Sequence, residues 1–309
     1  MPFRIAQTLL DTSIYLYPDQ PSAEEGRSTG GSGFVAGLPL EGMDGAHTLW
    51  AVTNRHVVDS GHWTIRLNNR AGGITCIDTV EEEWYFHPDG DDLAVRPLAV
   101  PNIARVNFIS LDDMLTEQAA HILDIGPGDS AFVIGRFVSM DGKQKNTPTV
   151  RFGQISQMPL EKIRYDKYVQ DAWLVEIKSL NGYSGSPVFC HLDQAYWRNS
   201  LNPVEGPDPI IGKAYDHKGK ILARGHFESG PYLLGVDCCM LPIWQKVCDN
   251  AFQEMQTGLQ VALNSGMMGV IPAWRLIDMM LNNPIRPAIE IHARAELEAG
   301  QDAVPIDAK

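Results

Sequence analysis

The sequence predicts a mainly β fold built from two barrels, with helices added between the barrels and at the C-terminal end. Short stretches rich in β-branched and aromatic residues recur along the chain, separated by Gly, Asn and Asp, a pattern typical of antiparallel barrels. The 309 residues are enough to bury a large core and to form two barrels in one unit. Apolar residues make up 44% of the chain and charged residues 20%, which is the composition of a soluble globular protein.

The first barrel, with an inter-barrel helix, is predicted over residues 1–125. Its strands are expected at 14–17, 33–37, 48–53, 63–67, 74–80 and 93–98. Apolar residues then recur at helical spacing between Leu111 and Leu123, and Ser110 precedes them as a suitable N-cap. We therefore expect a helix that crosses between the two barrels.

The second barrel, with the C-terminal helices, is predicted over residues 126–281. The barrel itself is expected from about Asp129 to Asp237. It includes an excursion at 191–220 that is either a functional loop near a cleft or a surface insertion.

Helical spacing returns between Ile243 and Leu259, which we interpret as a helix packed on the barrels. A strand that begins at Gly269 leads into a short helix from Ala273. Residues 282–309 are predicted to be a disordered tail, because the end of the chain is polar and acidic.

One short stretch, Gly182-Tyr183-Ser184-Gly185-Ser186-Pro187, has the composition of a tight turn that exposes a nucleophile. Glycines near Ser184 let the backbone bend sharply and let a substrate approach. Such a turn can direct the amide N–H groups of Gly182 and Ser184 at one point, where they would hold the negative oxygen of a tetrahedral intermediate. The same residues are compatible with an ordinary loop between strands, so the catalytic interpretation needs a base and an acid elsewhere.

The candidate base is His56, which follows an apolar run and the dipeptide Thr53-Asn54 at the end of a predicted strand. An unperturbed pKa of about 6.5 suits a general base at neutral pH. The other histidines lie in loop-like or mixed contexts. A histidine beside a strand is also compatible with a purely structural role.

The candidate acid is Asp92, which directly precedes the apolar run Leu93-Ala94-Val95. A carboxylate buried at the end of a strand can hold the second ring N–H of a histidine in place. Asp91 is the fallback and Asp89 also competes, since the segment around them can equally form a solvated turn.

Taken in order, these stretches resemble the trypsin/chymotrypsin-fold serine peptidases, specifically the bacterial branch that includes the high-temperature-requirement type. The motifs of that family read T-N-x-H-V, D-[LIV]-A and G-N-S-G-G-P, and this chain has TNRHVV, DLAV and GYSGSP. Further segments that resemble the family lie at Gly30–Val35, Gly126–Gly135, Leu233–Val236 and Gly269–Ala273. The resemblance runs from about Ile14 to Leu281.

The resemblance implies two six-stranded Greek-key β-barrels and a serine endopeptidase that uses no cofactor and no metal. His56, Asp92 and Ser184 would form its catalytic triad, and the amides of Gly182 and Ser184 its oxyanion hole. The substrate would be a protein or peptide.

Two positions depart from the pattern of the family. Tyr183 stands where the digestive enzymes have an acid that pairs with a newly cut N-terminus, and no Ile-Val-Gly-Gly start follows a basic cleavage site. Zymogen activation of that type is therefore not expected. Ser186 stands where a glycine is usual and adds a small side chain near the cleft.

Specificity is the least constrained property. Lys178, six residues before Ser184, would either favour an acidic side chain at the base of a pocket or simply face solvent. Bacterial relatives often accept small or aliphatic residues, and that is our default expectation. The other candidate substrate-binding residues are Tyr183, beside the nucleophile, and Leu234 and Gly235, on the strand expected to line the cleft.

The composition excludes several partners. A net charge of −13 argues against nucleic acid and against anionic membranes. The five cysteines are interpreted as free thiols in a reducing compartment. The N-terminal residues do not resemble a secretory signal, and no apolar run approaches the roughly 18 residues of a membrane helix, so we expect a cytoplasmic protein.

Two other functions remain open at this level. The same fold could serve as a catalytically silent binding or scaffolding module. An esterase or acyltransferase could use the same triad. The sequence leaves undecided the physiological substrate, the regulation and the oligomeric state.

Overall fold

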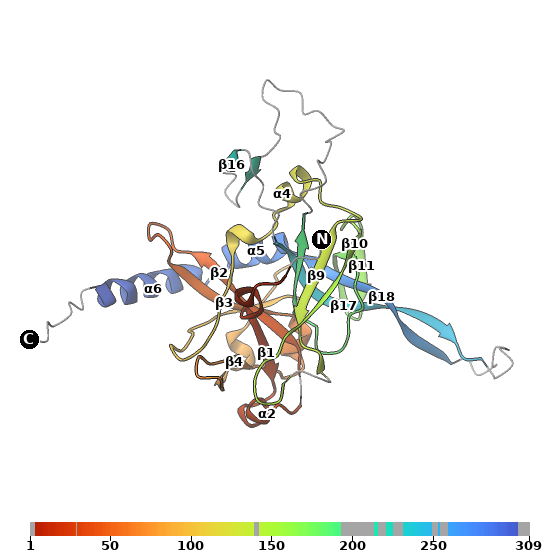
Figure 1. The fold of residues 1–309 in the computed structure, drawn as a ribbon, viewed down its shortest axis with the longest axis horizontal. Helices are drawn as coiled ribbons and strands as arrows, with labels where there is room; N and C mark the ends of the chain where they lie inside the picture. Colours follow the sequence, from red (N-terminus) through yellow and green to blue (C-terminus); the bar gives the residue numbers. More distant parts are fainter. Residues whose placement is uncertain are drawn as a thin grey trace, which may run out of the picture.

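The computed structural model describes residues 4–28, 30–138, 142–192, 213–215, 221–224, 231–248, 253 and 259–301. These residues form two β units packed against each other, with short helices at their edges and two helices near the C-terminal end (Figure 1). The predicted all-β fold class with added helices is confirmed. Most of the excursion expected at 191–220 lies outside the described residues.

The first unit is a sheet of eight strands in the order β5-β4-β1-β2-β3-β7-β6, with β8 paired in parallel to β2. Six of its strands are longer and match the predicted positions, and two two-residue strands add to them. The strands are β1 (Ser13–Tyr17), β2 (Ser32–Pro39), β3 (His47–Thr53), β4 (Thr64–Asn68), β5 (Ile74–Ile77), β6 (Tyr85–Phe86), β7 (Ala94–Pro97) and β8 (Ile109–Ser110). Four short helices accompany the sheet: α1 (Gln7–Leu10), α2 (Gln20–Glu25), α3 (Arg55–Asp59) and the 3-10 helix η1 (Glu81–Glu83).

The second unit is a closed barrel of six strands in the order β10-β13-β18-β17-β14-β9. Its strands are β9 (Ser130–Gly135), β10 (Thr149–Gln157), β13 (Trp173–Glu176), β14 (Pro187–His191), β17 (Tyr232–Lys246) and β18 (Gln260–Pro272). Two small hairpins stand apart from it: β11 (Lys162–Tyr165) with β12 (Tyr168–Asp171), and β15 (Lys213–Tyr215) with β16 (Ile221–Arg224). The barrel expected in this half of the chain is thus confirmed, but it continues beyond Asp237 to Pro272, because β18 is one of its strands and includes the strand expected after Gly269.

The helix predicted between Ile243 and Leu259 is wrong in the part that the structure describes. β17 continues to Lys246, and its end pairs with the start of β18, with Ile243 opposite Leu263. This hairpin projects away from the body of the protein (Figure 1). The apolar residues that suggested a helix are four apart, and residues four apart also share one face of a strand, so their spacing did not distinguish the two structures.

The inter-barrel helix predicted at 111–123 is interrupted. A 3-10 turn, η2 (Leu111–Asp113), comes first, and a separate helix, α4 (Glu117–Ile122), begins after the Thr116 side chain caps the Ala119 amide. Between them the Leu115 amide donates to the carbonyl of Leu233 on β17, at 3.0 Å. This bond to a neighbouring strand replaces a helical one, because one N–H cannot serve both.

The structure of the C-terminal end agrees with the prediction only in part. The closing helix is confirmed as α5 (Ala273–Leu281), but the expected disordered tail at 282–309 instead contains helix α6 (Arg286–Gln301). Ion pairs four residues apart support this helix, including Arg286 with Glu290 at 2.6 Å. Polar composition alone therefore did not indicate disorder here. Residues 302–309 lie outside the described part.

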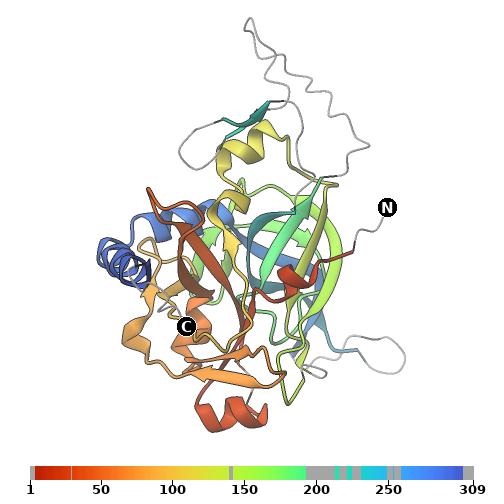
Figure 2. The ribbon, with the colours of Figure 1, turned by 60° about the vertical axis from the view of Figure 1, so that its left-hand side comes forward.

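The largest hydrophobic cluster among the described residues crosses the junction between the units. Phe34 and Trp50 of the first sheet belong to the same buried cluster as Phe132 and Val188 of the barrel and Leu276 of α5. Figure 2 shows the two units meeting along this junction, with α6 beside β3 of the first unit and α5 packed against β17 and β18 of the barrel. This cluster packs the two units against each other, while the buried residues that follow His56, Val57 and Val58, belong to a second cluster within the first unit.

Candidate active site

His56 lies on the wall of a cavity between the units because of the way β3 ends. The strand stops at Thr53, Asn54 is extended, and the short helix α3 then places His56 in its first turn. Asn54 stands at the N-cap position but makes no capping bond. Its buried side chain instead donates from Nδ2 to the backbone carbonyl of Asp92, at 2.8 Å.

Both carboxylate oxygens of Asp92 bind His56. The Nδ1 atom of His56 lies 2.6 Å from Oδ2 of Asp92, and the His56 backbone N–H donates to Oδ1 at 2.9 Å. The Asp92 side chain is 1% exposed, whereas that of His56 is 32% exposed. The carboxylate is thus fixed in the interior while the imidazole reaches the surface of the cavity. With Nδ1 as donor to Asp92, Nε2 is left as the acceptor.

The loop that carries Asp92 is held from the second unit. The Asp92 amide donates to Oε1 of Gln170 on β12, at 2.7 Å. Arg275 of α5 donates to Asp91 at 2.6 Å and to Asp89 at 2.7 Å. Asp91 and Asp89, the two alternatives considered for the acid, are therefore engaged with an arginine, and Asp92 is the carboxylate that contacts His56.

Ser184 lies at the junction of two successive turns. The Tyr183 amide donates to the carbonyl of Leu180 at 3.1 Å, and the Ser186 amide donates to the carbonyl of Tyr183 at 2.8 Å. The third residue of each turn is a glycine with positive φ, Gly182 at 94° and Gly185 at 84°. This is the signature of type II turns and explains why glycines stand at these two positions.

The turns leave two amides without an acceptor. Among the described residues, the N–H groups of Gly182 and Ser184 donate to no other group, whereas those of Tyr183, Gly185 and Ser186 all do. The two residues proposed from the sequence as oxyanion-hole donors therefore have N–H groups available to a ligand.

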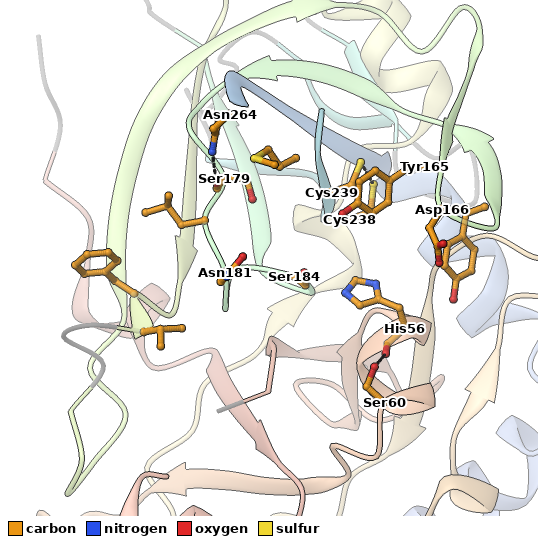
Figure 3. A pocket seen from close by; sticks show the side chains of 15 residues that line it. His56, Ser60, Tyr165, Asp166, Ser179, Asn181, Ser184, Cys238, Cys239 and Asn264 are labelled. Carbon is orange, nitrogen blue, oxygen red and sulfur yellow. Dashed lines mark hydrogen bonds between the residues drawn. The ribbon is translucent and has the colours of Figure 1, made fainter. Parts of the chain in front are cut away.

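The cavity has a volume of about 690 Å³, and both His56 and Ser184 line it (Figure 3). Its other walls come from the second unit: the hairpin residues Tyr165, Asp166 and Tyr168, the segment Ser179–Asn181, and the β17 residues Cys238–Met240 with neighbouring side chains. The described lining residues include no lysine or arginine.

A buried carboxyl group lies behind this wall. Asp237 is fully buried, and its Oδ2 accepts a hydrogen bond from the Ser179 hydroxyl at 3.0 Å. Burial raises the pKa of Asp237 to about 7. The group therefore changes charge in the same pH range as an ordinary histidine.

The four candidate substrate-binding residues do not line the cavity. Lys178 is exposed outside it, in agreement with the solvent-facing alternative. Tyr183 is 1% exposed, because its ring packs inward and its hydroxyl bonds to Thr149. Leu234 is fully buried in β17, and Gly235 pairs with Val188 and Pro272 on the neighbouring strands.

Sequence reasoning missed several residues that hold the site. Gln170 and Asp237 lie in stretches that read as ordinary strands, and their partners are 78 and 58 residues away in the chain. Asn54 was noted only as the end of a strand. A polar residue in an otherwise apolar strand was the one available signal for Asp237.

A closed six-stranded barrel packed on a second sheet is the architecture of the chymotrypsin-like fold, and here one unit carries a histidine–aspartate pair and the other a serine turn. No protein-family model matches the chain, and no curated protein matches it in sequence. Among the described residues, no group of three or more His, Cys, Asp or Glu side chains could hold a metal ion. No helix in that part is long and apolar enough to cross a membrane.

Solved structures with a similar arrangement include three at low identity. The protease domain of MamO from Magnetospirillum magneticum, in an apo form, is 12% identical over 88% of this chain and 96% of that one, with a TM-score of 0.43. An inactive serine-to-alanine mutant of Rv3671c from M. tuberculosis H37Rv is 14% identical over 89% of both chains, with a TM-score of 0.40. The protein HBP is 12% identical over 91% of this chain and 96% of that one, with a TM-score of 0.45. They carry no inference about chemistry, which has to come from the residues themselves.

Proposed function

We propose that this protein is a serine endopeptidase that hydrolyses peptide bonds through an acyl-enzyme. One observation carries the proposal: the imidazole of His56, bound through Nδ1 to buried Asp92 at 2.6 Å, shares a cavity with Ser184. The nucleophile, the base and the group that orients the base thus come together from three distant parts of the chain. This combination is what acyl transfer by a hydroxyl group requires.

Each residue has a distinct role in the proposed reaction. Ser184 attacks the carbonyl carbon of the scissile bond, and His56 accepts the hydroxyl proton on Nε2 and passes it to the leaving amine. Asp92 keeps Nδ1 protonated and stabilises the imidazolium that forms. The amides of Gly182 and Ser184 hold the oxyanion, each contributing about 3 kcal/mol in comparable reactions. Water then repeats the sequence on the acyl-enzyme.

The walls of the cavity favour a peptide over a small ester. Pairing of β14 with β17 ends at Val236, the backbone of Asp237 bonds to the nucleophile turn, and Cys238–Met240 beyond it line the cavity. An extended substrate can add to such a strand through main-chain hydrogen bonds, which a small ester cannot form. We therefore propose protein or peptide as the substrate class.

Labelling with a fluorophosphonate probe tests the proposal. The wild-type protein should be modified at Ser184 between pH 6 and 9, and Ser184→Ala should not be modified at all. A wild-type protein that remains unlabelled over this range would instead favour the catalytically silent alternative. Rates on a peptide and on its matched ester then separate a peptidase from an esterase.

A further inference from the structure

The backbone of the nucleophile turn alternates between peptide units that are held and peptide units that are open. The unit between residues 182 and 183 is held at both ends, because its carbonyl accepts from Ser32 at 2.7 Å and its N–H donates to Leu180. The unit between 184 and 185 is held likewise, by Ser32 at 2.8 Å and by Asp237 at 2.9 Å. The peptide units 181–182 and 183–184 carry the N–H groups of Gly182 and Ser184. Among the described residues, neither N–H group donates a hydrogen bond.

A single residue of the first unit, Ser32, supplies one contact to each held peptide. Its hydroxyl donates to the Gly182 carbonyl, and its amide donates to the Ser184 carbonyl. Ser32 is the first residue of β2 and is fully buried. A planar peptide that is anchored at its carbonyl cannot rotate without breaking that bond. Ser32 therefore restrains the rotation of both held units.

The direction of the Ser32 hydroxyl is also fixed. Its oxygen accepts the Arg136 backbone N–H at 3.0 Å. Because an amide supplies only a donor, the single hydroxyl hydrogen is left to point at the Gly182 carbonyl. If the hydroxyl hydrogen turned away, the Gly182 carbonyl would lose this donor.

The same residue is tied to the segment that carries the base. The Ser32 carbonyl accepts the Thr53 hydroxyl at 2.8 Å, three residues before His56. The backbones are too close for larger groups here: a Cβ atom at Gly185 would lie 2.2 Å from the Ser32 carbonyl oxygen. Ser32 is thus the point at which the His56 segment and the Ser184 turn meet.

On the basis of the proposed function, we infer that Ser32 is a positioning residue for the oxyanion hole. It holds the carbonyls of Gly182 and Ser184 so that the amides of the same two residues stay aimed at the developing negative charge. It acts on the turn and touches neither the substrate nor the reacting atoms. Because Ser32 is uncharged and already in place, the hole is formed without an ion pair at Tyr183.

The test compares Ser32→Ala with Ser13→Ala. Ser13 lies on β1 in the same sheet, is 8% exposed, and its hydroxyl has no hydrogen-bond partner among the described residues, so Ser13→Ala is a matched loss of a buried hydroxyl. Loss of one oxyanion donor lowers kcat about 100- to 1,000-fold in comparable enzymes, so a misaligned donor in Ser32→Ala should lower kcat by about 10- to 100-fold. KM should stay within about twofold, because only the transition state carries the oxyanion.

Two further readouts separate positioning from general damage. A peptide aldehyde, whose adduct with Ser184 places an oxyanion in the hole, should bind Ser32→Ala more weakly by about the same factor as kcat falls. The apparent pKa of the acylation rate should not move, because the contacts of His56 are unchanged. Ser32→Cys, which keeps the volume but donates weakly, should lie between wild type and Ser32→Ala, and it replaces Ser32→Ala if the latter does not fold.

Each outcome decides a different point. If the wild type is active and Ser32→Ala behaves like Ser13→Ala, the inference is wrong and the proposed function stands. If the wild type does not react with fluorophosphonate, the proposed function fails. A crystal structure of Ser32→Ala then decides the inference: an unchanged 182–183 peptide would overturn it, and a rotated one would support it.

Discussion

The backbone of Asp237 forms two hydrogen bonds with the nucleophile turn. Its amide donates to the Ser186 carbonyl and its carbonyl accepts from Gly185, both at 2.9 Å. Its side chain, buried behind the cavity wall, has a pKa raised from 3.8 to about 7 by that burial. In the folded protein the carboxyl group therefore holds its proton over a range in which the unfolded chain has already lost it.

The contribution of Asp237 to the stability of the protein should accordingly fall as pH rises from about 4 to above 7. The folded state binds more protons than the unfolded state in this window, so the Asp237 contribution to the free energy of unfolding decreases with pH, by up to about 4 kcal/mol. Asp237→Asn keeps the shape and cannot ionise. Urea unfolding at pH 5 and pH 8 should show a smaller loss for this variant than for wild type, and equal losses would refute the assignment.

Single residues were predictable where a local motif carries the chemistry. His56, Asp92 and Ser184 stand in short strings that resemble family motifs, and the structure places the first two in contact and the third on the same cavity. Ser32 and Gln170 gave no such signal. Their roles depend on partners 150 and 78 residues away, which the fold alone brings together.

At the scale of elements, an irregularity in the β17–β18 pairing shapes the cavity wall. The register shifts between Asp237 and Cys239, and such a bulge can turn two consecutive side chains toward one side. The sulfur atoms of Cys238 and Cys239 lie 3.5 Å apart, and both residues line the cavity. A hydrogen bond to Cys239 and burial raise the pKa of Cys238, so this thiol stays protonated.

Gly269 on β18 makes room for both sulfur atoms. A Cβ atom there would lie 2.7 Å from the sulfur of Cys239, 2.9 Å from Cδ1 of Ile163 and 3.4 Å from the sulfur of Cys238. We expect Gly269→Ala to lower the free energy of unfolding by about 1–3 kcal/mol through overpacking. Thermal or urea unfolding measures the loss.

A matched control and a rescue accompany this prediction. Gly126→Ala, where a Cβ would meet only the Met158 sulfur at 3.5 Å, should change stability by less than about 0.5 kcal/mol. Cys239→Ala should recover part of the loss when combined with Gly269→Ala. If the double variant is no more stable than Gly269→Ala, the contact with the Cys239 sulfur is not the cause of the loss.

Elements were predictable where their own residues decide their structure. The six longer strands of the first sheet follow from short β-branched runs. The 243–259 segment failed because its spacing suits a helix and a strand equally, and pairing with β18 decided between them. The prediction of a disordered tail was wrong because ion pairs between residues four apart, such as Arg286 with Glu290, stabilise a helix there. Composition alone does not indicate such pairs.

At the scale of the whole molecule, a buried arginine joins the two units. Arg136, just after β9, is fully buried, and its guanidinium group lies 4.7 Å from the ring centre of Tyr15 and 4.4 Å from that of Tyr17 on β1. One of its nitrogens also donates to the Tyr17 hydroxyl at 2.5 Å. The charge is thus placed between aromatic faces rather than left in an apolar interior.

Replacement of Arg136 should loosen the junction. We expect Arg136→Met to lower the free energy of unfolding by about 2 kcal/mol, because desolvated cation–π contacts are lost while the volume is largely kept. Arg164→Met, at an exposed position on β11, is the control and should be nearly neutral. Urea unfolding followed by tryptophan fluorescence gives the comparison. Equal stability of the two variants would show that Arg136 does not join the units.

The pairing of Arg275 with the Asp89–Asp91 loop has a consequence for the order in which the protein is made. The loop that presents Asp92 lies in the first third of the chain, and the side chain that secures it belongs to a helix near the end. The barrel likewise closes only with β18, over residues 260–272. Domains fold as their residues leave the ribosome, so a partly synthesised chain has its histidine, its aspartate and its serine but not the framework that aligns them. The proposed peptidase therefore acquires its active centre only after the residues of β18 and α5 have been made.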